Sequence, residues 1–166
     1  TGKGLKTDQA RVDGIVTLVP NSTVAINLLY NGSTTKSSGG DVPGETKNFL
    51  RSWEANATVT PIPTVYLFGS YRSGNGSTGD IRNTNITKNF VFSFTPFPYG
   101  ELQMNFNYNE TLRSVDDSRE RVMTPSLRWN FNPRSYLDLS YLSTRNDRRA
   151  FSDDTRAVTG SIRLSI

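Results

Sequence analysis

The feature of this 166-residue sequence that most constrains its fold is a series of short runs in which apolar and polar residues alternate. The clearest run covers 101–109 and places Leu102, Met104, Phe106 and Tyr108 against Glu101, Gln103, Asn105, Asn107 and Asn109. Successive side chains of a β-strand point to opposite faces, so this pattern predicts a strand with one apolar and one polar face. Similar runs, none with helical spacing, cover 24–30, 53–59, 85–95, 127–131, 137–141 and 158–166. Two further runs are weaker, because 64–71 is apolar on both faces and 10–19 alternates poorly.

Prolines divide these runs into hairpins. They mark turns near 20–21, 61–63, 96–99 and 132–134, spaced about 35 to 41 residues apart. Proline cannot donate a hydrogen bond to a strand ladder and therefore favours turns and strand ends. Longer polar stretches at 31–48, 73–83, 113–120 and 144–154 separate the hairpins. The sequence thus predicts short turns at one end of a sheet and longer loops at the other.

The length of the strands indicates whether such a sheet can cross a membrane. The runs are about 10 residues long, which matches a tilted membrane-spanning strand, and no run approaches the roughly 20 apolar residues of a membrane-spanning helix. We therefore expect an all-β, antiparallel, up-and-down transmembrane β-barrel of about 8–10 strands. It would form a single domain over 1–166, in which 1–8 is a loop or tail.

A water-soluble barrel or sandwich alternates equally well, with its apolar face turned inward. The polar face here is mainly Asn, Gln, Ser and Thr, whereas we expect all five lysines in loops or at strand ends: Lys3, Lys6, Lys36, Lys47 and Lys88. Tyrosines favour the membrane interface, and we expect one girdle at the loop ends of the strands and a second beside the turns: Tyr30, Tyr71, Tyr108 and Tyr141, then Tyr99 and Tyr136. Both observations favour the membrane barrel.

With this pattern, residues 9–166 resemble the meander-type outer-membrane β-barrels of Gram-negative bacteria. The run 160–166 is similar to the C-terminal strand that the barrel-assembly machinery recognises in that family, although it ends in Ile166 where Phe is usual. The resemblance implies a location in the bacterial outer membrane, contact with the lipid bilayer and lipopolysaccharide, and insertion by that machinery.

The strand count is odd. Four hairpins and a final run from Arg156 give nine strands, whereas bacterial single-chain barrels usually have an even number. We expect a strand before Thr1, which would make the chain the C-terminal part of a larger barrel. The alternatives are that the first run is not a strand, or that several chains build the barrel.

Composition excludes most catalytic sites. The chain has no His and no Cys, which removes Ser-His-Asp triads, Cys-His pairs and the usual zinc and haem ligands. The acidic pairs Asp116-Asp117 and Asp153-Asp154 fall in predicted loops, where solvated carboxylates are the ordinary interpretation. A net charge of +4 without a long basic run argues against nucleic-acid binding. We therefore expect no catalytic, cofactor or metal site, and not an enzyme.

The polar face contains the candidate functional residues. We expect ten of them to line the lumen: Asn89, Ser93, Gln103, Asn105, Asn107, Arg128, Asn130, Asp138, Ser140 and Arg163. Arg128, Asp138 and Arg163 belong to three successive strands, so a buried ion network among them would either plug a narrow barrel or favour anions in a wider one. The segment 145–149 is expected to be a basic loop whose charges are solvated, with contact to lipopolysaccharide phosphates as the alternative.

These observations predict a structural or anchoring barrel, or a pore with porin-like transport. One alternative is a barrel whose outward loops serve adhesion or binding. Another is a soluble, secreted β-barrel or sandwich that binds a ligand. Three results distinguish these functions. A pore conducts ions, an adhesion barrel binds a partner without conductance, and a soluble domain is purified without detergent.

Overall fold

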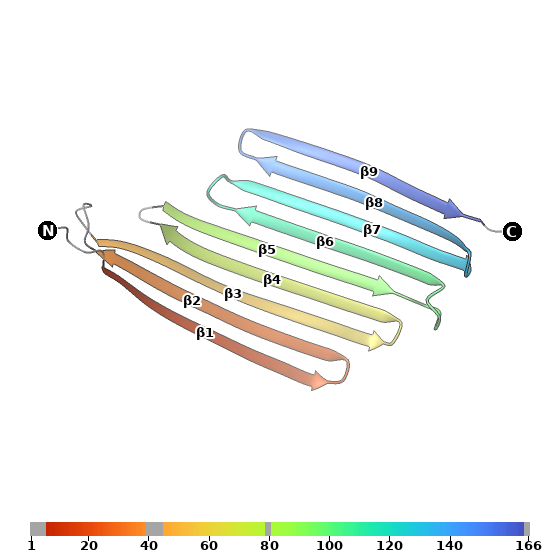
Figure 1. The fold of residues 1–166 in the computed structure, drawn as a ribbon, viewed down its shortest axis with the longest axis horizontal. Helices are drawn as coiled ribbons and strands as arrows, with labels where there is room; N and C mark the ends of the chain where they lie inside the picture. The colour runs from red at the N-terminus through yellow and green to blue at the C-terminus, as the bar shows by residue number, and fades with distance from the viewer. Residues whose placement is uncertain (1–5, 39–44, 79–80, 165–166) are drawn as a thin grey trace.

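The computed structural model describes residues 6–38, 45–78 and 81–164 of the chain. Over these residues it contains nine β-strands: β1 (Lys6–Asn21), β2 (Val24–Ser38), β3 (Glu45–Ile62), β4 (Val65–Thr78), β5 (Ile81–Phe94), β6 (Leu102–Arg113), β7 (Ser118–Asn132), β8 (Ser135–Arg148) and β9 (Phe151–Arg163). Each strand pairs antiparallel with the next, so the sheet is a simple meander from β1 to β9 (Figure 1). The prediction of an all-β antiparallel meander is confirmed.

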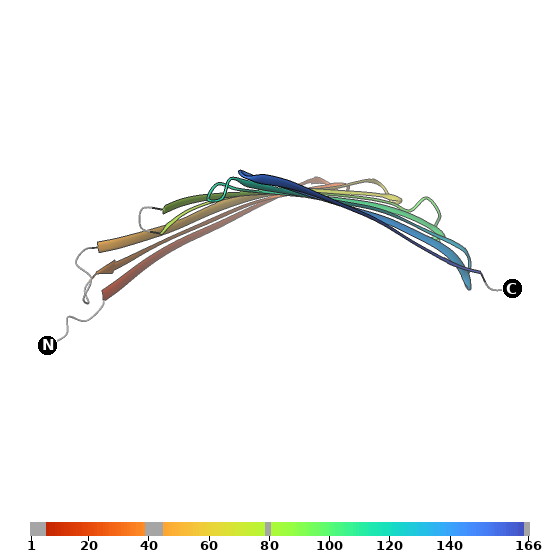
Figure 2. The same ribbon diagram turned by 90° about the horizontal axis from the view of Figure 1, so that it is seen from above.

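The sheet is one curved layer and is not closed into a barrel (Figure 2). β1 and β9 are its two edges, and the figure shows no second layer against either face. Barrel closure, which the sequence predicted, is therefore absent from this arrangement. The physical reason lies in strand direction: after eight antiparallel pairings β9 runs the same way as β1, so these two strands cannot complete an antiparallel ladder.

The strands are longer and the loops shorter than predicted. The hairpin turns follow Asn21, Ile62, Phe94 and Asn132, close to the predicted prolines. At the other end, β6 joins β7 through 114–117 and β8 joins β9 through 149–150, so most of the predicted loops are strand. The reason is that ladder hydrogen bonds join backbone groups, and polar side chains do not end them.

The first strand also extends into a segment that was predicted to be a loop or tail. β1 begins at Lys6, so residues 6–8 of the predicted loop or tail also belong to a strand. Residues 1–5 and Ile166 lie outside the described residues.

The register divides the side chains between two faces. The apolar face contains Val16, Leu28, Ala55, Tyr71, Phe92, Phe106, Leu127, Leu139, Val158 and their neighbours of the same alternation. Among the described residues no hydrophobic side chain is buried, and Trp53, Phe90 and Trp129 are each more than 40% exposed. The sheet therefore has no hydrophobic core of its own.

The register also resolves the two weak runs. In β4, Val65, Leu67 and Tyr71 lie on the apolar face, while Tyr66 and Phe68 lie on the opposite polar face. In β1, Val12, Val16 and Leu18 lie on the apolar face, and the register shifts between Leu18 and Asn21.

Candidate functional site

The ten residues expected to line a lumen all lie on the polar face. Antiparallel pairing places Ser93 opposite Asn105, and Asn105 opposite Ser126, which in turn is opposite Ser140. Gln103 is opposite Arg128, and Asn107 follows four residues further along the same strand as Gln103. Asn89 lies on this face in β5, as do Asn130 in β7 and Arg163 in β9. The structure thus assembles this set on one face, and its role in lining a lumen stays a prediction.

The ion network expected among Arg128, Asp138 and Arg163 does not form. Arg128 and Asp138 are directly opposite in the register, but the described residues include no ion pair between them. Arg128 instead donates from Nε to Asn130 Oδ1 at 3.4 Å, and its guanidinium lies over the Tyr136 ring, 5.4 Å from the centroid. In water an exposed arginine gains little from an ion pair, so the contacts with the Tyr136 ring and the Asn130 amide replace the expected pairing with Asp138.

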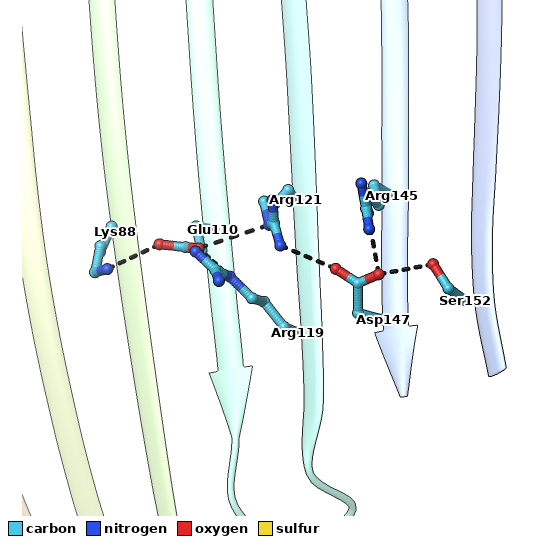
Figure 3. A network of polar contacts seen from close by, with 7 residues as sticks. All are labelled: Lys88, Glu110, Arg119, Arg121, Arg145, Asp147 and Ser152. Atoms are coloured by element: carbon cyan, nitrogen blue, oxygen red, sulfur yellow. Dashed lines mark hydrogen bonds and ion pairs between the residues drawn. The ribbon is translucent and has the colours of Figure 1, made fainter. Parts of the chain in front are cut away.

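A charged cluster lies instead on the apolar face, towards the ends of the strands away from the hairpin turns. It consists of Lys88, Glu110, Arg119, Arg121, Arg145 and Asp147, with Ser152 bound to Asp147 (Figure 3). These residues come from five successive strands, β5 to β9, and their side chains join across the ladders. The cluster occupies the face that carries Phe90, Tyr108 and Met123 two residues away along the strands.

Glu110 is the centre of one half of the cluster. Its side chain is only 3% exposed and accepts a hydrogen bond from Lys88 Nζ at 2.8 Å. Arg119 donates to its other oxygen, and Arg121 Nε is 3.8 Å from that same oxygen. Three cations thus surround one buried carboxylate, which satisfies its acceptor oxygens and leaves excess positive charge above it.

Asp147 is the centre of the other half. It accepts hydrogen bonds from Arg121 Nη2 at 2.9 Å, Arg145 Nε at 3.0 Å and Ser152 Oγ at 2.7 Å. The Ser152 hydroxyl, followed by the Arg145 guanidinium, holds the pKa of the Asp147 carboxyl below its ordinary value. Arg121 therefore joins the two halves into one network.

The sequence contained the signal for this cluster. Glu110 and Leu112 continue the even-numbered alternation of Leu102 to Tyr108, so they share its face. Lys88 was expected in a loop or at a strand end, but it lies within β5, opposite Glu110. The segment 145–149 was expected to be a loop, whereas Arg145 to Arg148 belong to β8. Strands that continue past the tyrosines are the reason that these charges meet.

The tyrosines of the apolar face form a regular diagonal across the sheet. Directly opposite residues define a row, and the row through Tyr30 continues across the strands to Asp147 in β8. The row through Tyr71 reaches β8 at Arg145, and the row through Tyr108 reaches it at Ser143. Tyr141 lies two residues beyond Ser143 along β8. Each step of two strands therefore shifts the tyrosine by two residues.

The hairpins follow the same diagonal. Each of β2, β4, β6 and β8 begins six residues before its tyrosine, at Val24, Val65, Leu102 and Ser135. A shift of one residue per strand, with a rise of about 3.3 Å per residue and a strand spacing of about 4.8 Å, corresponds to an angle of roughly 35°. Tyrosines and turns thus define two parallel boundaries, both inclined to the hydrogen-bonded rows.

The second tyrosine girdle does not occupy the apolar face. Tyr136 lies on the polar face beneath Arg128, and Tyr99 is in the connection between β5 and β6, where it is 91% exposed. Alternation explains this difference, because Tyr136 and Tyr141 are separated by an odd number of residues.

The acidic pairs do not converge into a site. Asp116 is in a turn and accepts a hydrogen bond from Ser118 Oγ, which lowers the pKa of its carboxyl. Asp153 and Asp154 are adjacent in β9 and therefore point to opposite faces, and Asp154 pairs with Arg156 at 2.6 Å. Among the described residues there is no group of three or more metal-ligating side chains. Over the same residues, no helix is long and apolar enough to cross a membrane.

Comparisons of this chain with known protein families, curated proteins and solved structures find no match.

Proposed function

We propose that this sheet is part of the wall of a bacterial outer-membrane β-barrel with a porin-like, pore-forming role. The apolar face contacts lipid acyl chains, and the polar face lines an aqueous lumen. In this arrangement the ten polar-face residues described above are the lumen-lining set.

The tyrosine diagonal is the observation that carries the proposal. If the tyrosines lie at one depth in a membrane, the strands are tilted by roughly 35°, within the approximately 35–45° of outer-membrane barrels. From Leu102 at the turn to Glu110 in the charged cluster, a strand tilted in this way rises roughly 22 Å, close to the roughly 25 Å apolar band of such barrels. A water-soluble sheet requires neither this strand tilt nor this height of the apolar band.

The uncovered apolar face supports the same proposal. A soluble sheet hides its apolar face against a second layer, but the sheet is a single layer and Leu28, Phe90 and Leu139 are each more than 40% exposed. An apolar surface of this extent needs a partner, and lipid is the partner that fits a band bounded by tyrosines and charges.

The two free edges support a barrel larger than nine strands. An open edge in hydrocarbon leaves backbone groups without hydrogen bonds, so the edges must be paired. Because β1 and β9 run in the same direction, an all-antiparallel closure requires an odd number of further strands between them. Barrels above roughly eight to ten strands leave an interior that side chains alone do not fill, which favours a pore over a plugged anchor. Insertion by the barrel-assembly machinery and contact with lipopolysaccharide belong to the same proposal.

Two linked measurements test the proposal. The chain is folded into detergent micelles, compared boiled and unboiled on a gel, and then fused with planar bilayers for conductance. We expect detergent-dependent folding, altered migration when unboiled, and stepwise conductance whose ion selectivity shifts in Arg128→Glu. The control Arg51→Glu, at an exposed arginine on the opposite, apolar face of the sheet, should leave selectivity unchanged. A folded monomer in detergent-free buffer would overturn the membrane proposal, and folding in micelles without conductance would leave only an anchoring barrel.

A further inference from the structure

The charged cluster has an excess of positive charge, which contact with lipid acyl chains does not by itself require. Four cationic side chains, Lys88, Arg119, Arg121 and Arg145, share two carboxylates, Glu110 and Asp147. Four positive and two negative charges leave a net charge of +2 within the cluster. It therefore has the electrostatic capacity for an additional anion.

The positive groups are on the outside of the cluster. Glu110 is 3% exposed, whereas the Arg119 and Arg145 side chains are 44% and 53% exposed. Each guanidinium has five N–H donors, and the contacts with Glu110 and Asp147 engage two nitrogens of Arg119 and one of Arg145, so both partly exposed groups have donors left for a further acceptor. Planar guanidinium groups bind phosphate oxygens through paired hydrogen bonds, so the exposed chemistry suits a phosphate.

A groove on the same face lies next to the cluster in the direction of the hairpin turns. Its volume is about 370 Å³, and it is lined mainly by apolar side chains: Phe92, Met104, Phe106, Pro125, Leu127, Leu139, Tyr141 and Val158. The described pairing of β7 with β8 passes from Met123 to Ser126 and omits Pro125, which has no N–H to donate. The missing ladder contacts at Pro125 coincide with the groove.

The groove and the cluster are separated by a distance that one lipid molecule spans. Pro125 is six residues from Arg119 along β7, and Tyr141 of the groove is four residues from Arg145 along β8, which correspond to about 20 Å and about 13 Å. A lipid phosphate at the arginines would place its acyl chain below them, at the level of the groove. The two features are on one face and aligned along the strands.

We propose that these two features form one site for a lipid with a phosphate-bearing headgroup. The phosphate binds Arg119 and Arg145, and one acyl chain occupies the groove at Pro125. This inference rests on the proposed function, because it needs the apolar face to be in contact with a bilayer.

Fluorescence quenching by brominated lipids tests the site. Trp129 is on the apolar face two residues from Leu127, so in the background Trp53→Phe it is the single tryptophan reporter. The chain is reconstituted into mixtures of phosphatidylcholine and phosphatidic acid in which one lipid at a time is brominated. We expect roughly five- to tenfold preference for phosphatidic acid, since each exposed ion pair contributes up to about a factor of five.

The double variant Arg119→Gln, Arg145→Gln should reduce that preference to near parity. Single Arg145→Gln is a milder second variant, because its side chain is half exposed, and should give an intermediate preference. The matched control Arg72→Gln, on the polar face, should retain the full preference. Unboiled gel migration checks that each variant has folded.

The outcomes separate the two proposals. If neither lipid quenches Trp129, the membrane proposal itself fails. If both lipids quench it equally, the apolar face contacts lipid but the site is wrong. If millimolar inorganic phosphate removes the preference, the cluster is a free-anion site and the lipid proposal is overturned.

Discussion

The diagonal of tyrosines makes a quantitative prediction about depth in a membrane. The chain has no cysteine, so a single cysteine placed at Tyr30, Tyr141 or Asp147 provides a unique position for a spin label. Tyr30 and Asp147 belong to the same hydrogen-bonded row, whereas Tyr141 is six residues from Asp147 along β8. The three labels therefore distinguish tilted strands from upright ones.

The expected depths follow from the tilt. With strands inclined by roughly 35°, the labels at Tyr30 and Tyr141 lie within about 4 Å of the same depth, and the label at Asp147 lies roughly 16 Å further out. With upright strands, Tyr30 would share the depth of Asp147 and differ from Tyr141 by about 20 Å.

Power-saturation electron paramagnetic resonance in lipid vesicles measures these depths through the relative access of oxygen and a nickel chelate. Equal depths at Tyr30 and Tyr141 support the tilted barrel wall. Equal depths at Tyr30 and Asp147 would refute the tilt, and with it the interpretation of the tyrosines as one membrane boundary.

Three further predictions concern the charges. Glu110→Ala should lower the free energy of unfolding in micelles by about 1–3 kcal/mol, because three partly exposed cations lose a buried partner. The control Glu120→Ala, at an exposed glutamate, should change it by less than about 0.5 kcal/mol. Equal effects of the two substitutions would contradict the role of Glu110. The pKa of Asp147 is lower in the folded state than in the unfolded state. Its contribution to stability is therefore present above its unfolded pKa of about 3.9 and is lost as the pH falls through the folded value. Asp147→Asn should consequently flatten the pH dependence of urea unfolding in that range. Asp138→Asn should change the free energy of unfolding by less than about 0.5 kcal/mol, since Asp138 forms no ion pair with any residue that the structure describes, and a larger loss would restore the network first expected with Arg128.

The strands and the hairpins were predictable from the sequence because alternation and proline have direct backbone meaning. Residues 102–108 alternate without a break, and the turns follow the prolines within one or two residues. The strand ends away from the hairpin turns were not predictable, because the polar segment 31–38 pairs as regularly with β1 as the apolar segment before it. Local composition says little about where a backbone ladder stops.

The candidate site was predictable only in part. Alternation assigned the polar-face residues, including Gln103 and Asn105, to one face, but it did not predict their partners. Arg128 and Asp138 are opposite each other and still do not pair, because the rotamers of exposed side chains are not set by strand register. The link from Glu110 through Arg121 to Asp147 required strands that continue past the tyrosines, which the sequence placed in loops.

The most direct test of the account is which face of β6 contacts lipid. Spin labels placed one at a time at Met104, Asn105, Phe106 and Asn107 sample both faces over four consecutive residues. The account predicts that in vesicles Met104 and Phe106 are accessible to oxygen from the bilayer, while Asn105 and Asn107 are accessible to the aqueous nickel chelate. Inaccessibility of Met104 and Phe106 to both reagents, in a chain that folds without lipid, would contradict it and place the apolar face against protein.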